Sequence, residues 1–65
     1  MTPAQFRTER ERLGFTQEPV ADMADLSYET VRDFEEGQPV NADLIECLRV
    51  TLESLGADFA SAVDQ

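Results

Sequence analysis

The chain has 65 residues, 42% of them hydrophobic and 8% aromatic, and its five Arg stand against fourteen Asp and Glu, for a net charge of −9. A domain of this size buries only about 60% of the surface of its unfolded chain, which leaves no room for a deep catalytic cleft. One Cys and no His exclude a disulfide framework, a zinc knuckle and His-dependent catalysis. We therefore expect no enzyme, no metal and no cofactor.

Membrane and export signals are also missing from the sequence. No apolar run approaches the roughly 20 residues of a membrane span, and no hydrophobic signal region follows Met1. A lone thiol suits a reducing compartment. The sequence predicts a soluble, single-domain, cytoplasmic protein with no membrane partner.

Charge is spread unevenly along the chain. The net charge is +1 over residues 1–15, −3 over 16–26, −3 over 27–36 and −4 over 37–65. A chain with this balance repels phosphate. General affinity for nucleic acid is therefore not the first expectation from composition.

Turn signals divide the chain into four expected helices, over residues 3–13, 17–24, 28–36 and 42–55. Thr2 or Pro3 opens the first, and Gly14 fits the position that follows a helix end. Thr16 is a favourable N-cap for the second.

A short break at Asp25-Leu26 separates the second and third expected helices, and Ser27 caps the third. The fourth begins at Asn41 or Ala42 and closes at Gly56. Two short helices joined by a tight break inside a four-helix domain form a helix-turn-helix layout. We expect the domain to span residues 1–56. Residues 57–65 are expected to be a tail that forms a short strand or frays.

Apolar residues at helical spacing predict the core. The expected core residues are Phe6, Leu13, Phe15, Val20, Met23, Ala24, Leu26, Val31, Phe34, Leu44, Ile45, Leu48, Leu52 and Leu55. Cys47 flanks the stripe of the fourth helix and is expected to be buried and inert, because the chain has no His or Lys to activate its thiol.

Three segments carry a recognisable motif: Thr16-Gln17-Glu18-Pro19-Val20-Ala21, Leu26-Ser27-Tyr28-Glu29-Thr30-Val31, and Phe34-Glu35-Glu36-Gly37. Together they resemble the Xre/Cro-type, lambda-repressor-like helix-turn-helix family. Arg10, Leu13 and Gly14 stand where the first helix of that family would have them. The resemblance implies an all-α domain of four to five helices that acts as a sequence-specific transcriptional regulator, a repressor, on double-stranded DNA.

The resemblance also implies site residues. In the family, the start of the third helix and a position one turn later face base edges in the major groove. The matching base-contact candidates are Tyr28, Glu29, Arg32 and Asp33. Gln17 matches a phosphate-binding Gln, and further phosphate-contact candidates are Arg7, Arg12 and Asn41. Arg10 and Glu35 match a structural ion pair of the family.

Other interpretations of these residues stay open. The four base-contact candidates can equally be a solvated helix face, and Arg7 stands at the spacing for a local pair with Glu11. The third helix keeps one cation, Arg32, and the loop after it has none. Acidic side chains can accept hydrogen bonds from cytosine N4, so they remain possible base readers. Asp25 stands where the family has a Gly in the left-handed conformation, which Asp tolerates better than most residues.

Two further functions compete with the regulator. An acidic interaction module, or DNA mimic, would dock on a basic protein partner, and the small partner of a toxin–antitoxin or phage-defence system could overlap with either function. The regulator needs Arg7, Arg12 and Arg32 on one face together with Gln17. The mimic needs a continuous acidic face that includes the third helix.

Assembly is expected to be a homodimer, because one acidic module offers few cations to phosphates. The candidate contact residues are Val50, Phe59 and Val63, which lie off the main stripe or beyond Gly56. The alternative for Phe59 is that it folds back onto its own domain.

Overall fold

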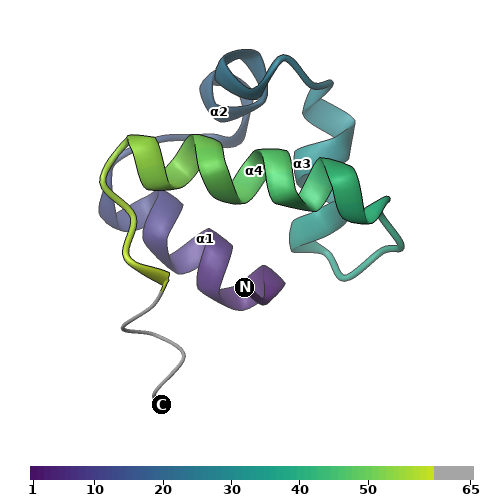
Figure 1. Ribbon diagram of the computed structural model, residues 1–65, viewed down its shortest axis with the longest axis horizontal. Coiled ribbons are helices and arrows are strands. Elements are labelled where there is room, and N and C mark those ends of the chain that lie inside the picture. Colours follow the sequence, from purple (N-terminus) through teal and green to yellow (C-terminus); the bar gives the residue numbers. More distant parts are fainter. Residues whose placement is uncertain (60–65) are drawn as a thin grey trace.

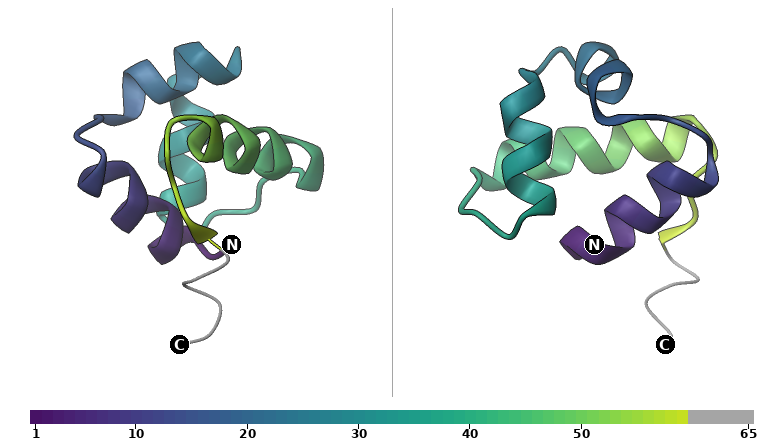
Figure 2. Two further views of the ribbon diagram at one scale, coloured as in Figure 1. Left: turned by 60° about the vertical axis from the view of Figure 1, so that its left-hand side comes forward. Right: turned by 180° about the vertical axis from the view of Figure 1, so that it is seen from behind.

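The computed structural model describes residues 1–59, and the four helices in this range are arranged around one core (Figure 1). They are α1 (Pro3–Arg12), α2 (Gln17–Ala24), α3 (Tyr28–Glu35) and α4 (Ala42–Ser54). In Figures 1 and 2, α4 lies between α1 on one side and α2 on the other, and α3 crosses its N-terminal half. The expected all-α fold is confirmed, and each helix begins and ends within one residue of its expected bounds.

Side chains before the helices explain where three of them begin: α1, α3 and, through Asn41, α4. Thr2 Oγ1 accepts the backbone N–H of Gln5 at 3.1 Å, and Gln5 Oε1 accepts the backbone N–H of Thr2 at 2.8 Å. This reciprocal pair is a capping box, which satisfies two N–H groups at the start of α1. Ser27 Oγ accepts the backbone N–H of Thr30 at 3.3 Å at the start of α3. Thr16 precedes α2 but makes no side-chain capping bond.

The turn between α2 and α3 is made by Asp25, which has φ 59° and ψ 40°. This left-handed conformation is unfavourable for most residues other than Gly, Asn and Asp. It lets the backbone N–H of Leu26 return to the carbonyl of Ala21 at 2.9 Å, which closes α2. The conformation expected for Asp25 is therefore confirmed.

The core joins all four helices. Its buried apolar residues are Phe6, Val20, Ala21, Val31, Phe34, Leu48, Leu52 and Phe59. Phe6 of α1 meets Phe34 of α3 edge to face, with ring centroids 5.6 Å apart, an arrangement that adds to the energy of burial. Six other expected core residues are partly buried against this cluster: Leu13, Phe15, Ala24, Leu26, Ile45 and Leu55.

Three of the sequence expectations about burial are wrong. Met23 is 46% exposed, because the inner side of α2 is set by Val20, Ala21 and Ala24, and at 100° per residue Met23 points roughly 110° away from it. On α4, the step of 100° per residue likewise places Cys47 outside the side that faces the core, so its thiol is exposed. Leu44 is only partly buried and is not packed against the core cluster.

The chain after α4 continues the domain. Gly56 turns the backbone with φ +116°, and Asp58 donates its N–H to Glu9 Oε1 at 3.0 Å. Phe59 then enters the core and is 4% exposed. Core packing therefore continues beyond the expected boundary at residue 56, and Phe59 folds back onto its own domain, which is the alternative that the sequence left open. Val63 lies outside the described residues.

Within residues 1–59, every helix is too short or too polar to cross a lipid bilayer.

Candidate nucleic-acid interface

One side of α3 is directed to solvent. Its opposite side buries Val31 and Phe34 in the core. The outward positions are spaced i, i+1, i+4 and i+5, which places them on one helix face, and they are Tyr28, Glu29, Arg32 and Asp33. The structure thus brings the four base-contact candidates together on a single accessible surface.

Arg32 is held on this surface by two neighbours. Its guanidinium carbon lies 5.9 Å from the centroid of the Tyr28 ring, within the range of a cation–π contact. Arg32 Nη2 lies 3.1 Å from Asp33 Oδ1, and this hydrogen bond raises the pKa of Arg32 above its ordinary value. Both side chains of the ion pair remain 40% exposed. The only cation of α3 is therefore oriented but accessible.

Beneath this face, Arg10 and Glu35 form a buried ion pair between α1 and α3. Arg10 donates Nε and Nη2 to the two Glu35 oxygens at 2.6 and 2.9 Å, and it donates Nη1 to the carbonyl of Phe15 at 2.8 Å. The hydrogen bond with Glu35 raises the pKa of Arg10. Gln17 Nε2 also donates to Glu35 Oε1, at 3.1 Å. Glu35 therefore sets the position of α1, of α3 and of the first residue of α2.

This network affects the expected phosphate contact of Gln17. One of the two amide N–H groups of Gln17 is used by Glu35. A primary amide carries two donors, so one remains for an anion. Asn41 is similar, because its Oδ1 accepts the N–H of Asp43 at 2.9 Å to cap α4 and its amide N–H groups are left to donate.

The two remaining phosphate-contact candidates are engaged with carboxylates. Arg7 Nε lies 3.3 Å from Glu11 Oε2, which is the local pair that the sequence left open. Arg12 Nη2 lies 2.7 Å from Glu9 and 3.2 Å from the carbonyl of Gly56. Gly56 follows α4 at the end of that helix away from α3 (Figures 1 and 2). Arg12 is thus not brought to the exposed face of α3.

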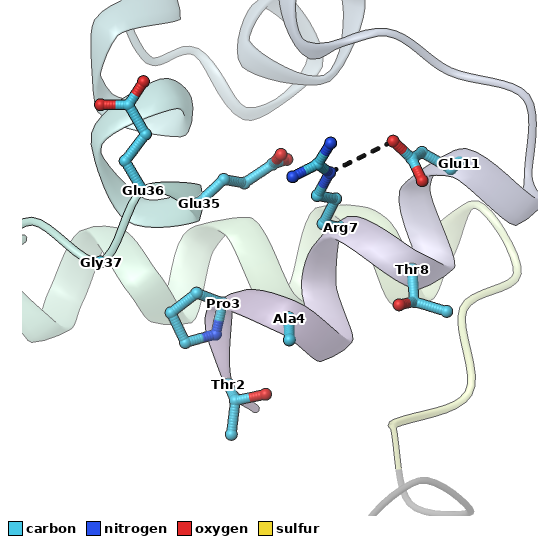
Figure 3. Close-up of a pocket in the computed structure, with 9 residues that line it drawn as sticks. All are labelled: Thr2, Pro3, Ala4, Arg7, Thr8, Glu11, Glu35, Glu36 and Gly37. Atoms are coloured by element: carbon cyan, nitrogen blue, oxygen red, sulfur yellow. Dashed lines mark hydrogen bonds and ion pairs between the residues drawn. The ribbon is translucent and has the colours of Figure 1, made fainter.

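A shallow hollow lies between the start of α1 and the end of α3 (Figure 3). In Figure 3 the side chains of Arg7 and Glu35 point toward one another across it. Of the charged side chains that line it, Arg7 pairs with Glu11 and Glu35 pairs with Arg10, while Glu36 makes no ion pair within the described residues. The hollow therefore offers a ligand one unpaired carboxylate and no unpaired cation. Within residues 1–59, no three side chains of the metal-ligating types lie together.

All arginines of the described residues are paired, whereas some of the carboxylates are not. Each of the five arginines pairs with a carboxylate, including Arg49, which binds both Glu46 and Glu53. No cation occurs between Arg12 and Arg32. Four carboxylates in that interval make no side-chain hydrogen bond or ion pair within the described part of the chain: Glu18, Asp22, Asp25 and Glu29. The three arginines that the regulator needs are thus each bound to a carboxylate of the same chain.

Comparison with known proteins identifies the family of the chain. A family model described as "Helix-turn-helix" matches residues 6–53, which run from the core of α1 almost to the end of α4. No curated protein and no solved structure shows significant similarity to the chain. The matched span includes α2, the Asp25 turn and the exposed face of α3. The chain therefore belongs to the helix-turn-helix family, of the Xre or lambda-repressor-like type, and is a DNA-binding regulator in the general sense of that family.

Proposed function

We propose that the protein is a sequence-specific transcriptional repressor that inserts α3 into the major groove of double-stranded DNA. The observation that carries this proposal is the single exposed face of α3, with its four candidate base-contact side chains in a chain of the helix-turn-helix family. A recognition helix contacts bases through residues of this kind at its N-terminal end. By occupying its site, the domain would exclude other proteins from the same DNA.

The chemistry of the face favours cytosine and guanine. The carboxylates of Glu29 and Asp33 accept hydrogen bonds, so they suit the N4 amino group of cytosine. Arg32 carries the paired donors that suit guanine O6 and N7. Arg32 donates Nε and Nη2 to Asp33 Oδ1 in the free protein, which leaves the donors of its Nη1 group for a guanine.

One copy of the domain makes too few phosphate contacts for tight DNA binding, and a second copy would supply more. With about three phosphate contacts per copy, the slope of log affinity against log salt is only about −3. A two-fold dimer doubles the contacts and presents two copies of α3 to half-sites roughly one helical turn apart. The outer flank of α4 is the interface that we propose, because Val50 is exposed there at 51%.

Selection from a pool of random duplex DNA, with the full chain and at low salt, tests the function. The expected product is an enriched motif with two inverted half-sites rich in G and C. No enrichment at any salt concentration would overturn the proposal. Enrichment of one half-site alone would support DNA reading by α3 and contradict the dimer.

A further inference from the structure

Arg32, the only cation of α3, is held by two neighbours on the exposed face of that helix. Its guanidinium carbon lies 5.9 Å from the centroid of the Tyr28 ring, which stands one turn earlier on the same side of α3. Arg32 also donates Nε and Nη2 to Asp33 Oδ1, at 3.3 and 3.1 Å. A cation–π contact and a charged hydrogen bond therefore both limit the conformations of this long side chain. We call Tyr28, Arg32 and Asp33 the arginine clamp.

The arginine clamp leaves defined polar groups unused. A guanidinium carries five N–H groups. Asp33 takes one on Nε and one on Nη2, so two neighbouring N–H groups remain at the end of the planar group, on Nη1 and Nη2. On Asp33, Oδ2 makes no hydrogen bond or ion pair within residues 1–59. Both side chains are 40% exposed. The pair thus offers a ligand two donors and, next to them, one acceptor.

One base pair in one orientation complements this pattern. Taken from the purine to the pyrimidine, a G·C pair presents acceptors N7 and O6 and then the donor N4 in the major groove. Cytosine N4 donates to guanine O6 within the pair, so these atoms lie about 2.9 Å apart. Arg32 Nη2 and Asp33 Oδ1 have a similar separation of 3.1 Å. An A·T pair presents acceptor, donor, acceptor, which sets one arginine donor against adenine N6.

We propose that Arg32 and Asp33 read a single G·C base pair as one unit, and that Tyr28 is a positioning residue for Arg32 that contacts no base. The inference rests on the proposed function, since it requires α3 in the major groove. Arg32 donates to guanine O6 and N7 while Asp33 accepts from N4 of the paired cytosine, so their ion pair is kept in the complex. Ordering Arg32 in the free protein lowers the entropic cost of fixing it on the base.

Competition binding with the selected motif and all of its single-base variants tests the proposal. Arg32→Met first identifies the base pair that Arg32 reads, as the position where preference is lost. Asp33→Asn and Tyr28→Leu are expected to lower the preference for G·C at that same position, about tenfold and about threefold, and at no other position. Tyr28→Phe retains the ring and is expected to retain the preference. These side chains are at least 40% exposed, so the variants should fold, which circular dichroism verifies.

Asp22→Asn is the matched control for Asp33→Asn. Asp22 is exposed on α2 and forms no ion pair with Arg32 in the described part of the chain. Each of the two variants removes one negative charge and should raise affinity for DNA of unrelated sequence. Only Asp33→Asn is expected to change the preference for a base pair.

A second measurement needs no DNA. In the free, isotopically labelled chain, ¹⁵N relaxation of the arginine Nε–H groups reports how strongly each side chain is ordered. Arg32 is expected to be more ordered than Arg7, which is 63% exposed and bonded to Glu11 alone. Tyr28→Leu and Asp33→Asn should each remove this difference, and Tyr28→Phe should preserve it.

Three results would overturn the proposal. They are an Arg32 side chain as mobile as that of Arg7, a loss of preference by Asp33→Asn at a different base pair from Arg32→Met, or a changed preference with Tyr28→Phe, which would make the Tyr28 hydroxyl a base reader. If a motif is enriched and the variants act at different base pairs, this inference fails while DNA reading by α3 stands. If no motif is enriched, both proposals fail.

Discussion

Arg10 and Glu35 are joined by two hydrogen bonds, of 2.6 and 2.9 Å, while their side chains are only 8% and 4% exposed. They stand 25 residues apart in the sequence and connect α1 to α3. Phe15 and Gln17 complete the set of partners, and among the described residues no buried side-chain nitrogen or oxygen lacks a hydrogen bond. Such a pair holds two helices in one arrangement, but it is stabilising only while both members are present.

We expect Arg10→Met to destabilise the domain by about 3 kcal/mol, because it leaves the Glu35 carboxylate buried without its cation. Adding Glu35→Leu should recover much of this loss, since no charge then remains unpaired. Recovery should be incomplete, because Gln17 and the Phe15 carbonyl also lose a partner. Urea unfolding of the wild type, the two single variants and the double variant measures the free energies of this double-mutant cycle. Additive losses would mean that the two residues are not coupled.

Phe59 should contribute to stability and not to assembly. Phe59→Ala removes a 4%-exposed core ring and should destabilise by about 3 kcal/mol. Thermal unfolding measures the change. If the alanine variant does not fold, Phe59→Leu replaces it, with an expected loss of about 1 kcal/mol. Cys47→Ala on the exposed side of α4 should change stability by less than about 0.5 kcal/mol. Equal effects at Phe59 and Cys47 would contradict the burial of the Phe59 ring.

Asp25 tests the strain of the turn. Asp25→Ala should destabilise by about 1 kcal/mol, because Ala tolerates the left-handed conformation less well than Asp does. Asp22→Ala is the control, since it makes the same chemical change one turn earlier in regular helix, where Ala is favoured and a carboxylate opposes the helix dipole. Urea unfolding should rank Asp25→Ala below the wild type and Asp22→Ala at or above it. The reverse order would show that the conformation of Asp25 carries no cost.

Glu29 tests base reading by α3. Glu29→Gln should raise affinity for DNA of unrelated sequence, because one charge near the phosphates is removed. It should also reduce the preference for the selected motif at one base pair, by about 1 kcal/mol or more if Glu29 accepts from cytosine N4. Competition binding with the motif and its single-base variants measures both effects. Equal strengthening on every sequence would show that Glu29 reads no base.

Val50 tests the proposed dimer. Light scattering after size exclusion at micromolar concentration should give twice the monomer mass for the wild type. Val50→Asp should give the monomer, since it places a charge in an apolar contact. Met23→Asp adds the same charge away from α4 and should leave the dimer intact. A monomeric wild type, or a dimer that survives Val50→Asp, would reject the interface.

The local sequence determined most of the helical framework. Caps and turn residues act over four or five positions, so Ser27 and Asp25 are sufficient to locate the start of α3 and the end of α2. The spacing of Val31 and Phe34 likewise determined which side of α3 faces the core, and so which side is left for a ligand. The pairing of Arg10 with Glu35 was accessible from the sequence through the family pattern alone, because no local rule links residues 25 positions apart.

Only the tertiary structure decided the remaining features. Phe59 enters the core because the turn after α4 carries the chain back to α1, where Asp58 meets Glu9, and nothing local to the tail encodes that contact. Met23 is exposed because the packing of α2 against α3 and α4 selects one side of a short helix whose apolar residues span more than that side. Charge counting along the chain yields only the net charge of each segment; the fold decided which charges form pairs. It pairs each arginine with a carboxylate and leaves the carboxylates of residues 18–29 facing solvent, because ion pairs form between the groups that packing brings within a few ångströms.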